Sequence, residues 1–223
     1  MIEKIIVFDL DDTLYKEIDF LKSAFKEIAT TISDRNTELG NSMYSLMMIE
    51  YQNGQNAFKK VIEENGIRKF SVEDLIHLYR NHKPNIQLGC ETRQVLENLK
   101  LMGFPLGIIT DGRSIQQRNK LQALGIESWF DHIIISEEFG SEKPDPSNYR
   151  YYEKFYKGQF YYIGDNVKKD FISPKILGWT TICLLDEGNN IHPQYFNLSE
   201  EYLPDYKIYN INQVMDIIKK EAV

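Results

Sequence analysis

Acidic side chains follow the first short apolar run of this chain, residues 5–8, in the series Asp9-Leu10-Asp11-Asp12-Thr13. Alternate side chains of an extended strand point the same way, so Asp9 and Asp11 would share one side. Two carboxylates at this spacing repel each other unless they share a cation or a proton. The pair therefore suggests a divalent metal ion, which carboxylate oxygens bind well. The alternative is a solvated acidic loop that caps a helix.

Anion-binding groups follow the next two apolar runs. The run 105–110 ends at Thr110 and is followed by Asp111, Gly112 and a predicted helix start. A hydroxyl, a glycine and a helix N-terminus can bind an anion, although a plain capped helix start has the same residues. Lys143 lies in the loop after the following run, where neighbouring prolines can hold a lysine close to an anion. Its alternative is an ordinary surface lysine.

A last polar group follows the apolar run 160–163, which ends in Gly164, Asp165 and Asn166. Gly164 permits a sharp turn that would leave Asp165 directly at the end of a strand. Asp170 could support Asp165 from behind, or it could be a carboxylate favoured by the N-terminal dipole of a helix.

The distribution of proline and glycine divides the chain into two parts. All seven prolines lie at or after Pro84, and the segment 18–80 has apolar residues at helical spacing. Four helices are predicted there, over about 21–32, 37–52 and 55–65, and after Ser71 as an N-cap with Asp74 three residues on.

After Pro84, predicted strands alternate with predicted helices. The strands are 105–110, 132–135, 160–163, 180–184 and 207–209. The helices are 91–102, 114–124, 146–156, one near Pro174 with Ser173 as its cap, and 211–221. Apolar strands between helices are typical of a parallel sheet covered on both faces, to which the strand 5–8 also belongs. Ligands bind beyond the carboxyl ends of such strands, where all the groups above lie.

The predicted fold class is therefore α/β, a Rossmann-like parallel sheet core with an inserted all-helical cap. The core is expected at 1–14 and 84–223, and the cap at 15–83. Residues 186–206 are predicted to be irregular. They could be a plain surface excursion or a contact with a partner or a neighbouring subunit.

In this order, each at the end of a strand, the polar groups resemble the haloacid dehalogenase-like hydrolase superfamily, in the type with a helical cap inserted after the first strand. The family motifs fall on Asp9-x-Asp11-x-Thr13, Thr110, Lys143-Pro144, and Gly164-Asp165 with Asp170. Two positions depart from the family pattern. Asp111 replaces a common asparagine and Pro174 a small residue, and we expect little effect from either.

The resemblance implies a phosphatase that depends on Mg²⁺. Asp9 is expected to attack phosphorus and form an aspartyl-phosphate, while Asp11 protonates the leaving oxygen and then activates water. The metal is expected to bind Asp9, the backbone carbonyl of Asp11 and Asp165.

The resemblance also implies the groups that would bind the phosphate and support the site. The phosphate-binding residues are expected to be Thr110, Asp111, Gly112 and Lys143. Asp170 is expected to orient Lys143 or a metal-bound water, with Asn166 in a similar supporting role.

Several functions remain to be weighed. Asp11 favours phosphoryl transfer, because the dehalogenases of the superfamily attack carbon and lack an aspartate there. A phosphosugar mutase of the same fold would use the same motifs. A non-catalytic phosphate-binding or interaction protein is a third possibility, although the four motifs are intact. A signalling receiver domain does not fit, because the insertion after Asp11 breaks its spacing. Nucleotides, sugar phosphates and phosphoglycolate all remain open as substrates.

Cap residues are expected to set the substrate. Four residues of the link into the cap could line the entrance: Tyr15, Lys16, Asp19 and Phe20. A basic cluster before Pro84 could meet a second anionic group, but a solvated helix end is the simpler interpretation: His77, Arg80, His82 and Lys83.

Composition excludes other classes. The net charge of -7, from 26 Lys+Arg and 33 Asp+Glu, argues against binding nucleic acid regardless of sequence. No apolar run approaches the roughly 20 residues that cross a bilayer, and the start is too short for a signal peptide. Cys90 and Cys183 are predicted to be buried small hydrophobes without a disulfide. We expect a cytoplasmic monomer or weak homodimer that acts on a small phosphorylated metabolite.

Overall fold

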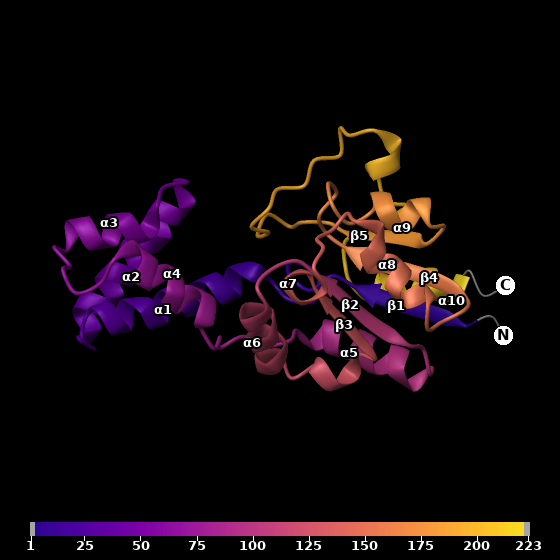
Figure 1. The fold of residues 1–223 in the computed structure, drawn as a ribbon, viewed down its shortest axis with the longest axis horizontal. Coiled ribbons are helices and arrows are strands. Elements are labelled where there is room, and N and C mark those ends of the chain that lie inside the picture. Colours follow the sequence, from indigo (N-terminus) through magenta and orange to yellow (C-terminus); the bar gives the residue numbers. More distant parts are fainter. Residues whose placement is uncertain (1–2, 221–223) are drawn as a thin grey trace.

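A six-stranded, all-parallel sheet forms the centre of the larger part of the molecule (Figure 1). The computed structural model describes residues 3–220. The strands lie in the order β3-β2-β1-β4-β5-β6. Their bounds are β1 Lys4–Phe8, β2 Leu106–Thr110, β3 His132–Ile135, β4 Gln159–Gly164, β5 Thr180–Leu184 and β6 Tyr206–Ile208. The predicted parallel sheet is confirmed.

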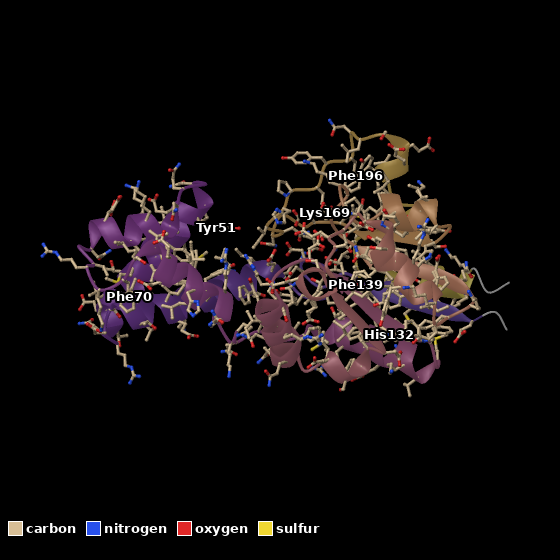
Figure 2. The ribbon with its side chains drawn as sticks, viewed as in Figure 1. Tyr51, Phe70, His132, Phe139, Lys169 and Phe196 are labelled. Carbon is tan, nitrogen blue, oxygen red and sulfur yellow. The ribbon has the colours of Figure 1, made fainter. Side chains whose placement is uncertain are left out.

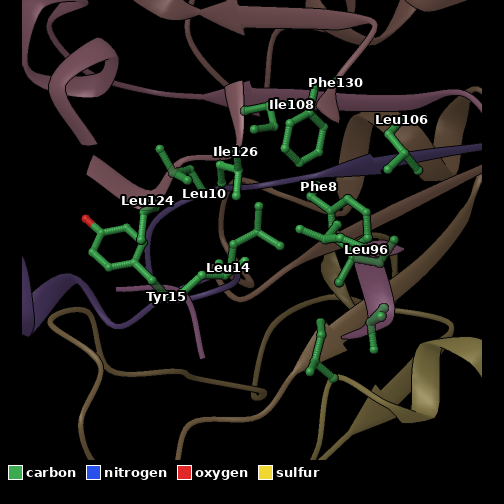
Figure 3. Packing of buried hydrophobic residues seen from close by; sticks show 14 of the residues in the cluster. Phe8, Leu10, Leu14, Tyr15, Leu96, Leu106, Ile108, Leu124, Ile126 and Phe130 are labelled. Atoms are coloured by element: carbon green, nitrogen blue, oxygen red, sulfur yellow. The ribbon is translucent and has the colours of Figure 1, made fainter. Parts of the chain in front are cut away.

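The first strand is buried on both of its faces. Ile6 and Phe8 pack into one apolar cluster, while Ile5 and Val7 pack into a second one across the sheet. Figure 3 shows the first cluster, in which Phe8 lies among side chains that come from helices and from neighbouring strands. This burial explains why the strand is continuously apolar, as expected of a sheet with helices on both faces.

The helices of this part connect the strands. They are α5 Cys90–Leu101, α6 Ser114–Leu124, α7 Ser136–Phe139, α8 Pro146–Glu153, α9 Ile172–Ile176 and α10 Gln213–Lys220, with short 3-10 helices at Glu127–Trp129 and Glu200–Tyr202. Because the strands they connect are all parallel, the carboxyl ends of the central strands lie at one edge of the sheet.

Four helices form a separate unit between β1 and α5. They are α1 Glu17–Ile32, α2 Thr37–Gln52, α3 Ala57–Glu64 and α4 Val72–Asn81. Figure 1 shows this unit at the left, away from the sheet. It has its own apolar cluster, in which Met43 and Met47 are buried. Ser71 and Asp74 form the predicted capping box at the start of α4, with reciprocal side-chain to backbone hydrogen bonds.

Some predicted details are wrong. Ser173 lies inside α9 and is not its cap, and its hydroxyl donates to the carbonyl of Pro144. The helix α8 ends at Glu153, three residues before the predicted end, and the four-residue α7 was not predicted. Cys90 is exposed at the start of α5, whereas Cys183 is buried as expected. These elements are short, so tertiary contacts outweigh local propensity in setting their ends.

Within residues 3–220, no helix is both long enough and apolar enough to cross a membrane.

Candidate active site

The candidate site lies where the strand order changes direction, at the carboxyl ends of β1, β2 and β4. Asp9 follows β1, Thr110 ends β2 and Asp165 follows β4. The N–H of Asp9 donates to the carbonyl of Ile163 at 2.8 Å, which continues the pairing of β1 with β4. The sheet therefore brings together residues that lie as far apart in the sequence as Asp9 and Asp165. Other open α/β sheets bind ligands at such a point.

A buried chain of charges crosses the site. Lys143 Nζ lies 2.6 Å from Asp9 Oδ1 and 2.8 Å from Asp170 Oδ1. The other carboxylate oxygen of Asp170 accepts the N–H groups of Asp165 and Asn166, at 3.1 and 2.8 Å. Asp170 thus contacts both Lys143 and the turn that presents Asp165, so it supports the two from behind.

Three buried carboxylates converge here. Atoms of Asp9, Asp165 and Asp170 that could bind a metal lie within 4.8 Å of one another. Burial is the main reason that the pKa of Asp9 rises to about 7 and that of Asp165 to about 9. Lys143 alone offsets only part of this negative charge. Oxygen ligands with excess negative charge fit a hard divalent cation. Both carboxylate oxygens of Asp170 already accept hydrogen bonds or an ion pair. Asp9 and Asp165 are therefore the carboxylates best able to bind such a cation.

Asp11 points into a different set of contacts. Its carboxylate accepts from Lys120 Nζ at 2.7 and 2.8 Å, from Tyr15 Oη at 2.5 Å and from Gln117 Nε2 at 2.8 Å. Burial raises the pKa of Asp11, but the ammonium of Lys120 and the hydrogen bonds from Lys120, Tyr15 and Gln117 together lower it by more, so the net shift is downward. Lys120 is itself buried and lies 3.5 Å from Glu17 Oε1, where burial raises the pKa of Glu17 to about 8.

Sequence reasoning missed Gln117, Lys120 and Glu17. Gln117 and Lys120 are three residues apart on α6, so they lie on the same helix face. That face is buried, and a polar pair on a buried face directly after a suspected anion-binding loop was a usable signal.

Of the predicted phosphate-binding residues, Thr110, Asp111 and Lys143 line one pocket with Asp9, whereas Gly112 is not among its lining residues. Thr110 is buried, and its hydroxyl accepts from Gln117 Nε2 at 2.6 Å. The Asp111 carboxylate accepts from the backbone N–H of Lys143 at 3.0 Å and from Lys169 Nζ at 2.9 Å. The N–H of Gly112 donates to the hydroxyl of Ser136 at 2.9 Å. Asp111 thus ties the Lys143 loop to the end of β2, a contact that the sequence did not indicate.

The pocket that contains Asp9 has a volume of about 130 Å³. It is lined by Asp9, Asp11, Asp12, Glu17, Thr110, Asp111, Lys143, Asp165, Asn166, Lys169 and His192. Figure 2 shows Lys169 on the side of the core that faces the helical unit. The pocket therefore opens between the sheet and the helices inserted after β1.

Arg113 and the basic residues before Pro84 lie elsewhere. Arg113 is exposed and pairs with Glu137 at 2.7 Å. His82 is buried and bonded to Glu27 and Ser23. Both are absent from the lining of the 130 Å³ pocket, as are the other members of the basic cluster, His77, Arg80 and Lys83.

Residues 186–194 reach the site from the irregular segment. Asn190 Nδ2 donates to Asp165 Oδ2 at 2.9 Å, and His192 lines the pocket. The segment is thus no plain surface excursion over these residues.

Comparisons with known proteins agree with this arrangement. The chain matches the model of a family described as haloacid dehalogenase-like hydrolase over residues 6–184. A glyceraldehyde 3-phosphate phosphatase of Methanocaldococcus jannaschii is 31% identical over 96% of this chain and 96% of its own length. A protein of the same name from Pyrococcus furiosus is 26% identical over 98% of this chain and 94% of its own length.

A solved structure shares the fold. The crystal structure of the hydrolase YfnB of Bacillus subtilis bound to magnesium superposes with a TM-score of 0.68. The match covers 98% of this chain and 99% of that one, at 20% sequence identity. The likeness spans the sheet and the inserted helices together.

Proposed function

The chain belongs to the haloacid dehalogenase-like hydrolase family and is a phosphoric monoester hydrolase, and we propose that it works with Mg²⁺ through an aspartyl-phosphate intermediate. The observation that best supports this mechanism is the buried contact of Asp9 with Lys143, beside Asp165 at the end of β4. It combines a nucleophile, a fixed positive charge and a second carboxylate in one small pocket.

In the first step, an oxygen of Asp9 attacks phosphorus and the bond from phosphorus to the leaving oxygen breaks. Asp11 gives a proton to that oxygen, so an alcohol departs. In the second step, water attacks the phosphorus of the aspartyl-phosphate and Asp11 takes its proton, which releases inorganic phosphate and restores Asp9. The pairing of Asp11 with Lys120 favours the carboxylate form that the second step needs.

Lys143 has two roles in this mechanism. Its ammonium lies 2.6 Å from Asp9, where it would also bind an oxygen of the transferring phosphoryl group. Thr110 and Gly112, at the end of β2, would orient the remaining oxygens. Asp170 holds Lys143 in place from behind.

A divalent cation suits the buried carboxylates, and we assign Asp9, the backbone carbonyl of Asp11 and Asp165 to it. When bound, Mg²⁺ would screen the repulsion between Asp9 and a phosphate dianion and polarise the phosphoryl group. Asn166 would support the loop of Asp165, because its N–H is fixed by Asp170.

The helices α1–α4 would act as a cap. We place the cap at 15–83 and the core at 1–14 and 84–223, because the helical unit has its own apolar cluster. A cap closing over the pocket would exclude water during the first step. The names of the two archaeal relatives favour a three-carbon sugar phosphate as the substrate.

Release of p-nitrophenol from p-nitrophenyl phosphate tests the mechanism, with Mg²⁺ and with EDTA. We expect turnover with Mg²⁺, none in EDTA, and a loss of at least about 10³-fold in Asp9→Asn. Asp34→Asn is the matched control, because Asp34 is exposed and its surface pair with Lys69 contributes little.

Activity that survives in EDTA would rule out the metal, and activity in Asp9→Asn would rule out the nucleophile. Turnover that requires a sugar bisphosphate activator would identify a mutase. A folded, metal-binding protein with no activity on any ester would be a binding protein.

A further inference from the structure

Residues 186–194, which we call the strap, follow β5, begin with a local turn and are bonded to the core at their far end. The Asp186 carboxylate accepts the N–H groups of Gly188, Asn189 and Asn190 at 2.8, 2.9 and 3.0 Å. At the other end, Gln194 Nε2 donates to the carbonyls of Asp165 and Leu184, both at 2.8 Å. These hydrogen bonds give the strap a defined path along the core.

The middle of the strap bridges the core and the first turn of α1. The amide of Asn190 donates to Asp165 Oδ2 at 2.9 Å, while its oxygen accepts from Lys16 Nζ at 2.8 Å. The N–H of Ile191 donates to Asp12, whose other oxygen accepts from the N–H of Glu17, each at 2.9 Å. The strap thus lies across the junction where the chain enters the helical unit.

The strap contacts both the pocket and the helical unit. The side chain of Ile191 packs against the apolar cluster of α1–α4. The next residue, His192, lines the pocket that also contains Asp9, Asp11 and Lys143. At about 130 Å³ this pocket is smaller than the roughly 300–1,000 Å³ that encloses a drug-sized ligand.

We infer that the strap is a wall of the active site that selects small substrates, with His192 as the residue that limits their size. This inference rests on the proposed function, since it concerns the alcohol part of a phosphate ester bound beside Asp9. On this proposal, esters of about three carbons are accepted and a nucleoside or a hexose is excluded, because the pocket holds only about 130 Å³. Asn190 and Gln194 hold the wall in position and need not touch the substrate.

Two esters of different size test the wall. Values of kcat/KM are measured for glycerol 3-phosphate and adenosine 5′-monophosphate in the wild type, His192→Ala and His192→Trp. We expect the ratio of adenosine monophosphate to glycerol phosphate to rise about tenfold in His192→Ala and to fall in His192→Trp. Asn190→Ala should raise the ratio as well, because it releases the strap from Asp165 and Lys16.

Asn197→Ala is the matched control. Asn197 is an exposed residue of the irregular segment 186–206, but it lies outside the strap and outside the pocket lining. Dissociation constants for the two esters are also measured by calorimetry in the presence of Mg²⁺. For this measurement each substitution is made in the Asp9→Asn protein, and the ratio of the two constants is compared. Binding tests the wall without turnover.

The two failures are distinguishable. A wild type that hydrolyses neither ester contradicts the proposed function, while the binding ratio still reports on the wall. Ratios that stay within about twofold of the parent in both His192 variants overturn the inference, whichever readout is used.

Discussion

Lys143 is surrounded by more negative charge than it can neutralise. Asp9 and Asp170 contact it directly, and Asp165 lies beside them, all in the protein interior. Buried charges persist only when they are paired or bind a metal. Burial, and after it the neighbouring carboxylates, raise the pKa values of Asp9 and Asp165, and a cation at the site would favour their charged forms.

Asp11→Asn separates the acid role from the rest of the site. Asparagine cannot give a proton to a leaving alcohol, so kcat/KM for an alkyl ester such as glycerol 3-phosphate should fall by about 10²–10⁴-fold. The loss should be smaller for p-nitrophenyl phosphate in its first step, because p-nitrophenolate departs without a proton. Burst kinetics measure that step. Equal losses of the burst rate for both esters would contradict the assignment of Asp11 as the acid.

Lys120→Met leaves the Asp11 carboxylate without its buried cationic partner. Removing one member of a buried ion pair costs about 3–5 kcal/mol, so the free energy of unfolding in urea should fall by that order. Lys100→Met, on an exposed face of α5, is the control and should change stability little. A loss no larger than that of the control would mean that Lys120 is not needed to balance Asp11.

The turn after β4 sets the positions of several active-site side chains. A side chain on Gly164 would overlap the carboxylate of Asp170, so only glycine fits this close approach. Because Asp170 receives the N–H groups of Asp165 and Asn166, the turn and its carboxylate form one unit. The element thereby sets the positions of both Asp165 and Lys143.

Gly164→Ala should displace Asp170 and with it Lys143. We expect kcat to fall by at least about tenfold, with a loss of thermal stability, because a buried hydrogen-bonded carboxylate must move. Gly89→Ala is the matched control, since its added methyl group meets only Thr92 Oγ1 at an ordinary 3.9 Å. A fully active Gly164→Ala enzyme would show that Asp170 does not position Lys143.

Across the whole molecule, α4 lies against α6, where Asn119 donates to the carbonyl of Asn81. The two parts also meet at a junction around the active-site loops. The strap, the link at Lys16 and Glu17, and Lys120 all lie at this junction. The charged pocket therefore lies where the two parts join. Ligand binding there can stabilise the junction as well as the site.

Stability without metal should fall as the pH rises from about 5 to 9. The pKa values of Asp9, Glu17 and Asp165 are about 7, 8 and 9 in the folded chain, against 3.8, 4.5 and 3.8 as ordinary values. The folded state thus binds more protons than the unfolded state in this window, so raising the pH favours unfolding.

Urea midpoints at several pH values, in EDTA and in saturating Mg²⁺, measure this effect. We expect Mg²⁺ to raise the midpoint most at the alkaline end, where the carboxylates are free to bind it. A midpoint in EDTA that increases with pH over the same range would contradict the burial of these carboxyl groups.

The class of fold and the chemistry of the strand ends could be predicted from the amino-acid sequence. Apolar runs, glycine stops and the Ser71 cap are local signals, so the sheet and most helix bounds could be predicted from them. Asp9, Thr110 and Asp165 also follow strands directly, and parallel strands bring their carboxyl ends together whatever the details of packing.

Which distant side chains meet these groups depends on how the elements pack in three dimensions. Lys120 pairs with Asp11 across 109 positions, and Asn190 reaches Asp165 from a segment without regular structure. The spacing of Gln117 and Lys120 marks a polar face of α6, but no local pattern specifies which distant residue Lys120 or Asn190 meets, because that depends on how helices and loops pack around the sheet. The exposed Cys90 and the early end of α8 have the same origin, since packing and solvent access outweigh local propensity there.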